Sequence, residues 1–330
     1  MSITNQSPDS KLVIDADEFS AYFDRYPFKL VHRLAQHPLL QLPRLVQLAH
    51  DRGGEALYFR GDHRINQVDD DAPATNRTFI EKKLARPALS AAETIAQIAA
   101  CSAWLQLRDV GTDREYAQLL AEIIDEFRPH AESVAPGLDS ARADIFVSSP
   151  RATTPFHLDE EHNFLLQIRG SKQLSICDGF DPDVVSRETL RDFFRGNGEL
   201  ARHTARLEEH AVHVTLQAGE GVHIPPCHPH WVQNGAEVSI SLGILWLSDV
   251  TARRRHLYRV NDWLERLGLQ PAQPGEHPKL DALKAWPATL KRRARRALQA
   301  RTNRAPLLGS RRAGWKNQED QRGVLVQRGS

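Results

Sequence analysis

The sequence predicts an all-β core with helical flanks, in the manner of a sandwich or a jelly roll. Before Ala143 the apolar residues recur with helical spacing, and from Ala143 onward they fall into short runs typical of strands. Glycine-containing turns separate these runs. With 330 residues, of which 41% are hydrophobic and 26% charged, the chain can bury a sizeable core and is neither disordered nor fibrous in composition.

The first region, residues 1–140, is predicted as a helical layer that packs on the core. Pro43 and Gly53 stand where a helix begins and ends. Ser90 and Thr112 each precede a glutamate by three residues, which is the capping-box pattern of a helix N-terminus. The apolar residues that share one face of the helix after Thr112 are Tyr116, Leu119, Leu120, Ile123 and Phe127.

The central region, residues 141–250, is predicted as the β core. Its strand-like runs are 145–147, 164–168, 173–177, 211–216 and 238–246. Along the last run, apolar residues alternate with serine and glycine, as in a strand with one apolar face. The charged segment 181–210 interrupts the strands and is interpreted as an insertion.

The C-terminal region is predicted to hold amphipathic helices within residues 251–290. Their apolar stripes are Leu257, Val260, Leu264 and Leu267, and then Leu280, Leu283, Trp286 and Leu290. Pro287 disfavours one unbroken helix through this region, because an internal proline costs about 3 kcal/mol. The stripes need cover, either from the chain's own core or from a second copy, and we expect a homodimer through residues 251–290.

Charge is unevenly distributed along the chain. Residues 291–312 hold nine basic residues and no acid, so with a net charge of +1 the rest of the chain carries −8. The acidic body argues against a nucleic-acid-binding core. Residues 291–330 are expected to form a mobile basic tail, the alternative being a helix that folds back onto the acidic body.

Neither targeting signals nor disulfide patterns are evident. The first twelve residues lack a secretory signal, and the longest apolar run, residues 238–247, is too short to span a bilayer. The three cysteines show no C-x-x-C spacing, so neither a disulfide framework nor a cysteine zinc site is indicated. We expect a soluble, cytoplasmic protein.

One group of residues has the spacing of metal ligands. His157 and Asp159 are two positions apart, so on a strand both side chains face the same way. A third ligand must come from another strand, where His228 and His230 are candidates. Two histidines and one carboxylate form the facial triad of non-haem Fe(II) oxygenases, which leaves positions for a co-substrate and O₂. The H-x-D pattern alone is weak evidence in a chain with 15 histidines.

The residues around this group match a wider pattern. Residues 154–172 read TPFHLDEEHNFLLQIRGSK, and residues 219–231 read GEGVHIPPCHPHW. Over residues 143–246 the chain resembles the JmjC-type, cupin-like Fe(II)- and 2-oxoglutarate-dependent oxygenases, which include the hypoxia-pathway asparagine hydroxylase. The resemblance implies a double-stranded β-helix, the jelly roll of cupin and JmjC proteins.

The resemblance also implies roles for individual residues. The implied iron ligands, and hence catalytic residues, are His157, Asp159 and His230. The register of the family pattern favours His230 over His228 as the third ligand. The residues implied to bind 2-oxoglutarate are Lys172, which would pair with its distal carboxylate, Thr154, which would hydrogen-bond the same group, and Asn163, which would lie nearby.

The implied function is that of a hydroxylase of a protein, peptide or small molecule. Two alternatives stay open. One is a catalytically silent cupin-like binding or regulatory protein, and the other is a metal-dependent cupin enzyme that does not use 2-oxoglutarate. The presence of Lys172 and Thr154 beside a complete triad argues against both.

Overall fold

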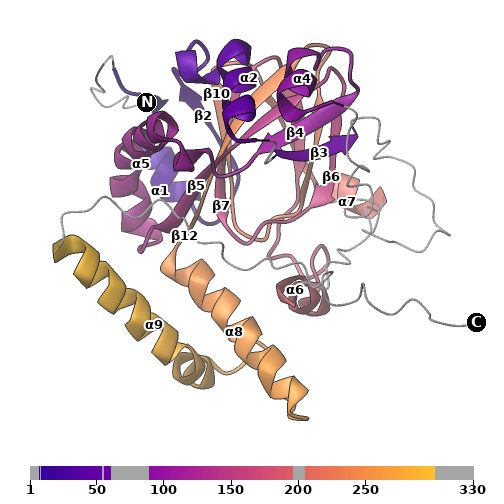
Figure 1. Cartoon of the computed structure of the whole chain (residues 1–330). Coiled ribbons are helices and arrows are strands. Elements are labelled where there is room, and N and C mark those ends of the chain that lie inside the picture. Colours follow the sequence, from indigo (N-terminus) through magenta and orange to yellow (C-terminus); the bar gives the residue numbers. More distant parts are fainter. Residues whose placement is uncertain (1–6, 8, 54–55, 61–88, 196–204, 302–330) are drawn as a thin grey trace, which may run out of the picture.

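Two antiparallel sheets form the body of the protein (Figure 1). The computed structural model describes residues 7, 9–53, 56–60, 89–195 and 205–301. The strands of the larger sheet, in spatial order, are β1 (Leu12–Val13), β2 (Phe28–His32), β10 (Glu220–Ile224), β7 (His162–Arg169), β12 (Ser239–Leu247), β5 (Asp139–Ser148), β4 (Ala103–Leu107) and β3 (Ala56–Arg60). Those of the smaller sheet are β6 (Thr153–His157), β11 (His230–Asn234), β8 (Lys172–Ile176) and β9 (Val212–Leu216).

Helices cover the outer face of the larger sheet and extend from its end. The α-helices are α1 (Ala16–Tyr22), α2 (Leu42–Asp51), α4 (Ala91–Ala96), α5 (Arg114–Val134), α6 (Arg187–Phe194), α7 (Ala205–His210), α8 (Asp249–Arg266) and α9 (Pro278–Arg301). Two short 3-10 helices are η1 (Pro38–Leu40) and η2 (Val110–Thr112). No helix among the described residues combines the length and the apolar character needed to cross a bilayer.

Alternation along the strands of the larger sheet creates two cores. Phe164 and Leu166 on β7 face the helices and pack with Ile244 on β12 and Phe127 on α5. Leu165 faces the other way and packs, between the two sheets, against residues of the smaller sheet. The apolar residues of this inner core are Leu165, Leu174, Ile176, Leu216, Val222, Ile224 and Val232. The predicted all-β core with helical flanks, a jelly roll, is confirmed.

The first third of the chain is not purely helical, which corrects the prediction for residues 1–140. Strands β1, β2, β3 and β4 extend the larger sheet at both edges. Five-residue apolar runs such as Ala103–Leu107 are too short for their period to separate helix from strand, and pairing with β5 decides between them.

The helix boundaries in this region agree with the sequence in two of three places. Ser90 and Glu93 form the predicted capping box, with reciprocal hydrogen bonds of 2.7 and 3.2 Å. Helix α2 has a proline in its first turn, and Gly53 follows it with a φ of +60°. The cap of α5 is Asp113 rather than Thr112, because the Asp113 carboxylate accepts a hydrogen bond from the amide of Glu115 at 2.9 Å.

The start of the predicted mobile tail is instead helical and anchored. Helix α9 runs through Pro287 to Arg301, and the chain turns before it, between α8 and α9. Arg292 and Arg296 bind the Asp249 carboxylate at 3.0 and 2.7 Å, and Arg295 pairs with Asp139. These ion pairs hold the second half of α9 against the acidic body. Residues 302–330 lie outside the described residues.

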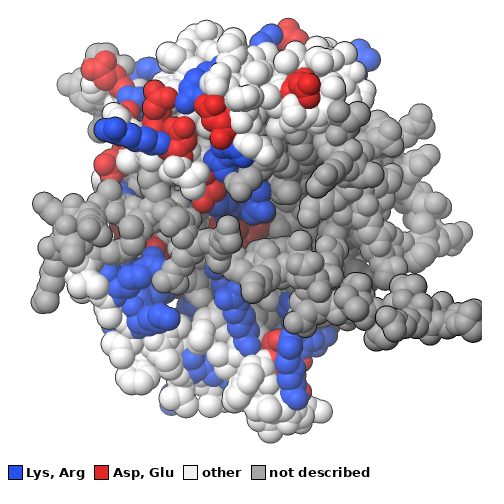
Figure 2. Space-filling view, in the orientation of Figure 1, with Lys and Arg blue, Asp and Glu red and all other residues white. Residues whose placement is uncertain are grey.

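Figure 2 shows that the charged side chains on the half of the molecule where α8 and α9 lie are mainly basic. Acidic side chains are seen chiefly on the other half of the same face. The folded-back helix that the sequence left as an alternative therefore accounts for the basic segment as far as Arg301.

Candidate metal centre

A β-bulge places Thr154 and His157 on the same face of β6. Thr154 lies opposite Val232 of β11, and His157 lies opposite His230, so β6 has one more residue than β11 between the two pairs. Directly opposed residues project from the same face. Val232 belongs to the core between the sheets, and Thr154 and His157 therefore also face the interior.

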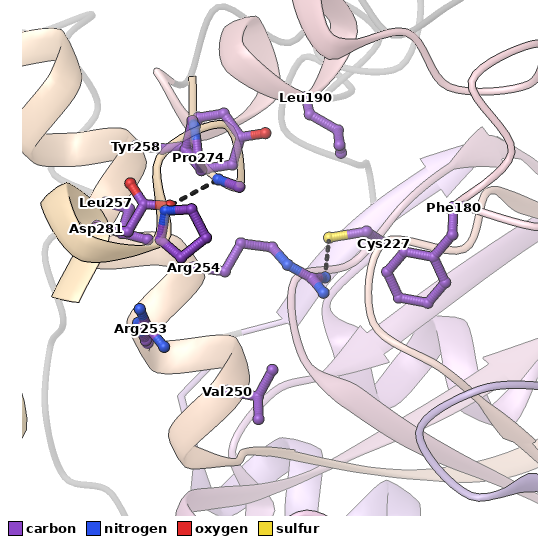
Figure 3. Close-up of a pocket in the computed structure, with 13 residues that line it drawn as sticks. Phe180, Leu190, Cys227, Val250, Arg253, Arg254, Leu257, Tyr258, Pro274 and Asp281 are labelled. Atoms are coloured by element: carbon purple, nitrogen blue, oxygen red, sulfur yellow. Dashed lines mark hydrogen bonds between the residues drawn. The ribbon is translucent and has the colours of Figure 1, made fainter. Parts of the chain in front are cut away.

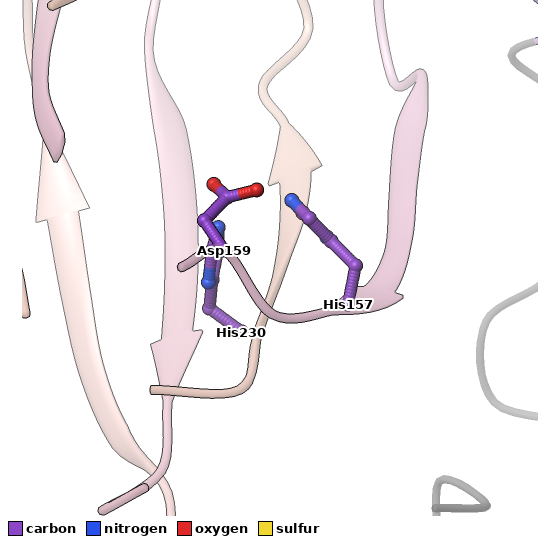
Figure 4. Close-up of side chains that lie close together, drawn as sticks. All are labelled: His157, Asp159 and His230. Carbon is purple, nitrogen blue, oxygen red and sulfur yellow. The ribbon is translucent and has the colours of Figure 1, made fainter. Parts of the chain in front are cut away.

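His157, Asp159 and His230 come together at one end of this interior (Figure 4). Their candidate ligand atoms all lie within 4.8 Å of one another, and the two imidazole centroids are 4.1 Å apart. Asp159 lies beyond the end of β6, so the following loop brings it to His157, whereas the sequence suggested strand alternation. Two imidazole nitrogens and a carboxylate oxygen in this arrangement can hold one divalent ion.

The environment of His230 prepares it to act as a ligand. Its Nδ1 lies 3.0 Å from the carbonyl oxygen of His228. A carbonyl can only accept, so Nδ1 carries the proton and Nε2 keeps a free lone pair. Burial, followed by the neighbouring His157, holds the pKa of His230 well below its usual range. The imidazole is therefore neutral, as metal binding requires.

His228 is directed away from this group. Its Nδ1 faces the carbonyl of Pro226 at 3.2 Å, its Nε2 lies 3.6 Å from Asp178, and its ring contacts Phe180 with centroids 5.3 Å apart. The register that favoured His230 over His228 thus agrees with the geometry.

Lys172 projects into the same interior from β8. It is 6% exposed, lies opposite Asn234 of β11, and follows the alternation of Leu174 and Ile176. The described residues give its ammonium group no ion-pair partner, and burial lowers the pKa of Lys172 to about 7. Because an unpaired buried cation is unfavourable, this position fits an anionic ligand.

Asn163 of β7 is also buried in the interior. Its Oδ1 has no hydrogen-bond partner among the residues that the structure describes. Gly243 on the adjacent strand approaches it closely, since a Cβ at Gly243 would lie 3.7 Å from Oδ1 and only 3.1 Å from the Phe146 ring. A buried acceptor without a partner calls for an explanation, and a bound ligand is one.

The family model of the cupin-like domain matches residues 45–251, which is more than half of the chain. The chain belongs to the cupin-like domain family. The predicted resemblance to cupin-like proteins is confirmed. No curated protein matches the sequence.

Solved structures similar to this cupin include YcfD of Escherichia coli. One, described as the X-ray structure of E. coli ycfD, is 14% identical with a TM-score of 0.42, covering 81% of this chain and 62% of that one. A second, described as YcfD, a ribosomal oxygenase, in complex with cobalt and 2-oxoglutarate, is 13% identical with a TM-score of 0.43, covering 86% and 68%. The cupin thus spans 62% of the length of the first.

The loop that carries Asp159 in this cupin is held from three sides. The Asp159 carbonyl accepts a hydrogen bond from the Cys227 amide at 2.7 Å. Glu160 forms a two-point ion pair with Arg255 of α8. Glu161 binds Arg142 of β5 at 2.8 Å. These contacts hold Asp159 and the two residues that follow it.

The arginine at the base of this loop was missed by sequence reasoning. Arg142 bridges Glu161 and the fully buried Asp144, which also accepts hydrogen bonds from Gln106 and the Asp109 amide. Burial opposes its charge, but Glu161, Asp144 and more weakly Asp159 raise the pKa of Arg142. The available signal was a pair of oppositely charged residues, Arg142 and Asp144, at alternate positions directly before the apolar run 145–147.

Proposed function

We propose that this cupin is an Fe(II)- and 2-oxoglutarate-dependent oxygenase that acts as a hydroxylase. The observation that carries the proposal is the joint placement of a His–Asp–His group and an unpaired buried lysine in one barrel interior. His157, Asp159 and His230 would hold the iron, which would supply the oxygen chemistry and leave positions for a co-substrate.

Lys172 supports 2-oxoglutarate as that co-substrate. Lys172 lies opposite Asn234 on β11, four residue steps along that strand from His230. Four steps correspond to about 13 Å between the two backbone positions. Side chains reaching inward from both positions leave a gap suited to a small dicarboxylate. Its distal carboxylate would restore the charged form of Lys172, and Thr154 and Asn163 supply further polar groups beside it.

Anaerobic titration of the Fe(II)-loaded protein with 2-oxoglutarate tests the proposal. We expect a visible metal-to-ligand charge-transfer band in the wild type. Iron binding without a band would favour a metal-dependent cupin that does not use 2-oxoglutarate. Absence of iron binding would favour a silent binding protein.

Lys172→Ala sharpens this test. The variant should bind iron almost normally but bind 2-oxoglutarate more weakly by about 2–5 kcal/mol, or at least roughly thirtyfold, because a buried charge pair loses one partner. Lys29→Ala, which removes a lysine from an exposed pair with Glu220, is the matched control and should change neither affinity. Unchanged 2-oxoglutarate affinity in Lys172→Ala would remove Lys172 from the site.

We also propose that two copies associate through α8 and α9. Trp263 on α8 and Leu283, Trp286 and Leu290 on α9 are 53–71% exposed. Large apolar side chains gathered on two adjacent helices are typical of a protein interface. Light scattering should give a dimer for the full chain and a monomer for Leu283→Glu, whereas Val212→Glu, at an exposed strand position, should stay dimeric. A monomeric wild type at all concentrations would contradict the proposal.

For the substrate, we keep the sequence-based prediction of a protein, a peptide or a small molecule. The three cysteines are free, which supports the proposed location in the reducing cytoplasm.

A further inference from the structure

A pocket outside the barrel interior lies between α8, the segment after β8 and the turn before α9 (Figure 3). Its volume is about 430 Å³, within the usual range for small-molecule sites. Phe180, Leu190, Val250 and Leu257 provide apolar walls, and Cys227 closes the inner end. The pocket therefore offers an apolar cleft of ligand size.

Arg254 brings a positive charge into this cleft. Figure 3 shows its side chain extending from α8 to Cys227, whose Sγ accepts a hydrogen bond from Nη1 at 3.4 Å. Its guanidinium carbon lies 5.1 Å from the centroid of the Phe180 ring. A thiol is a weak acceptor and an aromatic face carries no net charge, so neither contact neutralises the cation.

Carboxylates near Arg254 do not form an ion pair with it. Among the described residues, no carboxylate oxygen lies within 4.0 Å of its guanidinium nitrogens. Asp281 lines the pocket but is 5% exposed, and its carboxylate already accepts a hydrogen bond from the Gly275 amide at 2.7 Å. Burial raises the pKa of the Asp24 carboxyl, and the charge of Arg254 partly offsets this rise. The two groups are nevertheless too far apart to form an ion pair. Arg253 adds a second positive charge at the exposed rim.

We propose that this pocket binds a ligand in which a carboxylate or phosphate group is attached to an apolar or aromatic body, with Arg254 as the partner of the acidic group. The planar guanidinium matches either anion in two-point geometry. Phe180 and Leu257 lie where the apolar body would pack.

The position of the pocket connects it to the candidate metal centre. Cys227 forms its inner wall and donates its amide hydrogen to the carbonyl of Asp159, and His230 follows three residues later. The wall thus belongs to the segment that carries His230 and is hydrogen-bonded to the loop that carries Asp159. We assign the pocket to the substrate. This assignment rests on the proposed oxygenase function, whereas the anion site itself does not.

Calorimetric titration of the metal-free full chain tests the anion site directly. The probes are benzoate, phenyl phosphate and the neutral analogue benzamide. We expect at least one anion to bind roughly tenfold or more tightly than benzamide, and the tighter of the two anions identifies the preferred acidic group. Equal binding of all three probes, or no binding of either anion, would overturn the proposal.

Variants assign the binding to this pocket. Arg254→Gln should weaken the preferred anion roughly tenfold or more, while Arg266→Gln removes a surface arginine of the same helix and should leave it unchanged. Lys172→Ala should also leave it unchanged, which excludes binding in the barrel interior. Loss of anion binding in Lys172→Ala with retention in Arg254→Gln would overturn the assignment.

A second substitution keeps the test decisive if Arg254→Gln does not fold. Phe180 is 50% exposed, so Phe180→Ala should fold normally and weaken the aromatic anion severalfold. Undiminished affinity in Phe180→Ala would contradict the proposed place of the apolar body. Because no iron or 2-oxoglutarate is present, these results are independent of the charge-transfer test.

Discussion

Strand β7 meets two different environments on its opposite faces. The helix-facing side carries Phe164 and Leu166, both almost fully buried, and Phe164 contacts the aromatic rings of Phe19, Phe127 and Trp246. The barrel-facing side carries Asn163, whose buried Oδ1 lacks a hydrogen-bond partner among the described residues. One face of the same strand therefore contributes apolar packing, and the other presents a buried acceptor that the described residues leave unpaired.

This contrast teaches where mutations should affect folding and where they should affect binding. On the helical side, Phe164 and Leu166 belong to one continuous buried apolar core of the isolated chain. The barrel interior contains Asn163 of β7 and Lys172 of β8, whose polar groups are buried at an energetic cost. Such a division predicts large losses of stability on the first face and neutral or stabilising effects on the second.

The largest effect is expected for Phe164→Ala. It should lower the free energy of unfolding by about 3–5 kcal/mol, because a fully buried ring is replaced by a cavity. Urea denaturation followed by circular dichroism measures the loss. Asn163→Ala, at the neighbouring position on the opposite face, should change the same quantity far less. Equal losses in the two variants would break the comparison.

Replacement of Lys172 by methionine should stabilise the ligand-free protein. The folded pKa of Lys172 is about 7, against an ordinary value of 10.5, so the unfolded chain binds more protons between these values. By linkage, this group makes stability rise with pH from about 7 to 10.5, and its burial is most unfavourable below pH 7. Lys172→Met should be more stable at pH 7 by an amount on the order of a few kcal/mol and should lack this slope.

Parallel unfolding measurements across that pH window test the linkage. Lys29→Met removes an exposed lysine and serves as the control, which should keep the wild-type slope. If wild type and Lys172→Met show the same dependence of stability on pH, folding does not lower the pKa of Lys172.

The smallest effect concerns the loop that carries Asp159. Arg142→Gln should weaken Co(II) or Fe(II) binding by roughly 10–100-fold, because residues that orient ligands contribute about this much to metal affinity. Glu161→Gln removes the other end of the same ion pair and should act in the same direction. The absorption spectrum of bound Co(II) reports both affinity and geometry.

Arg44→Gln offers a matched charge loss on α2, in a pair with Glu115 that does not contact the Asp159 loop, and should leave metal binding unchanged. Normal Co(II) affinity in both Arg142→Gln and Glu161→Gln would show that the ion pair supports folding only. Metal binding in the barrel interior would then not depend on the Arg142–Glu161 ion pair.

Local sequence determined much of this protein. The change of hydrophobic period near Ala143 predicted the β core. The H-x-D spacing of His157 and Asp159, together with the family pattern that includes His230, predicted the residues that the structure brings together. Lys172 was identified from its place in a family pattern, and its burial is consistent with that assignment. These features depend on neighbours in the chain or on short motifs, which a single sequence displays.

Tertiary structure alone decided the remainder. Strand pairing turned the ambiguous run Ala103–Leu107 into part of the sheet, and a bulge placed Thr154 on the face of His157. Ion pairs between residues more than 40 positions apart fixed α9 to Asp249, and Arg142 of β5 reached Glu161 beside β7 in the same sheet. Contacts between distant segments depend on how the sheets close, and no local period or motif encodes that closure.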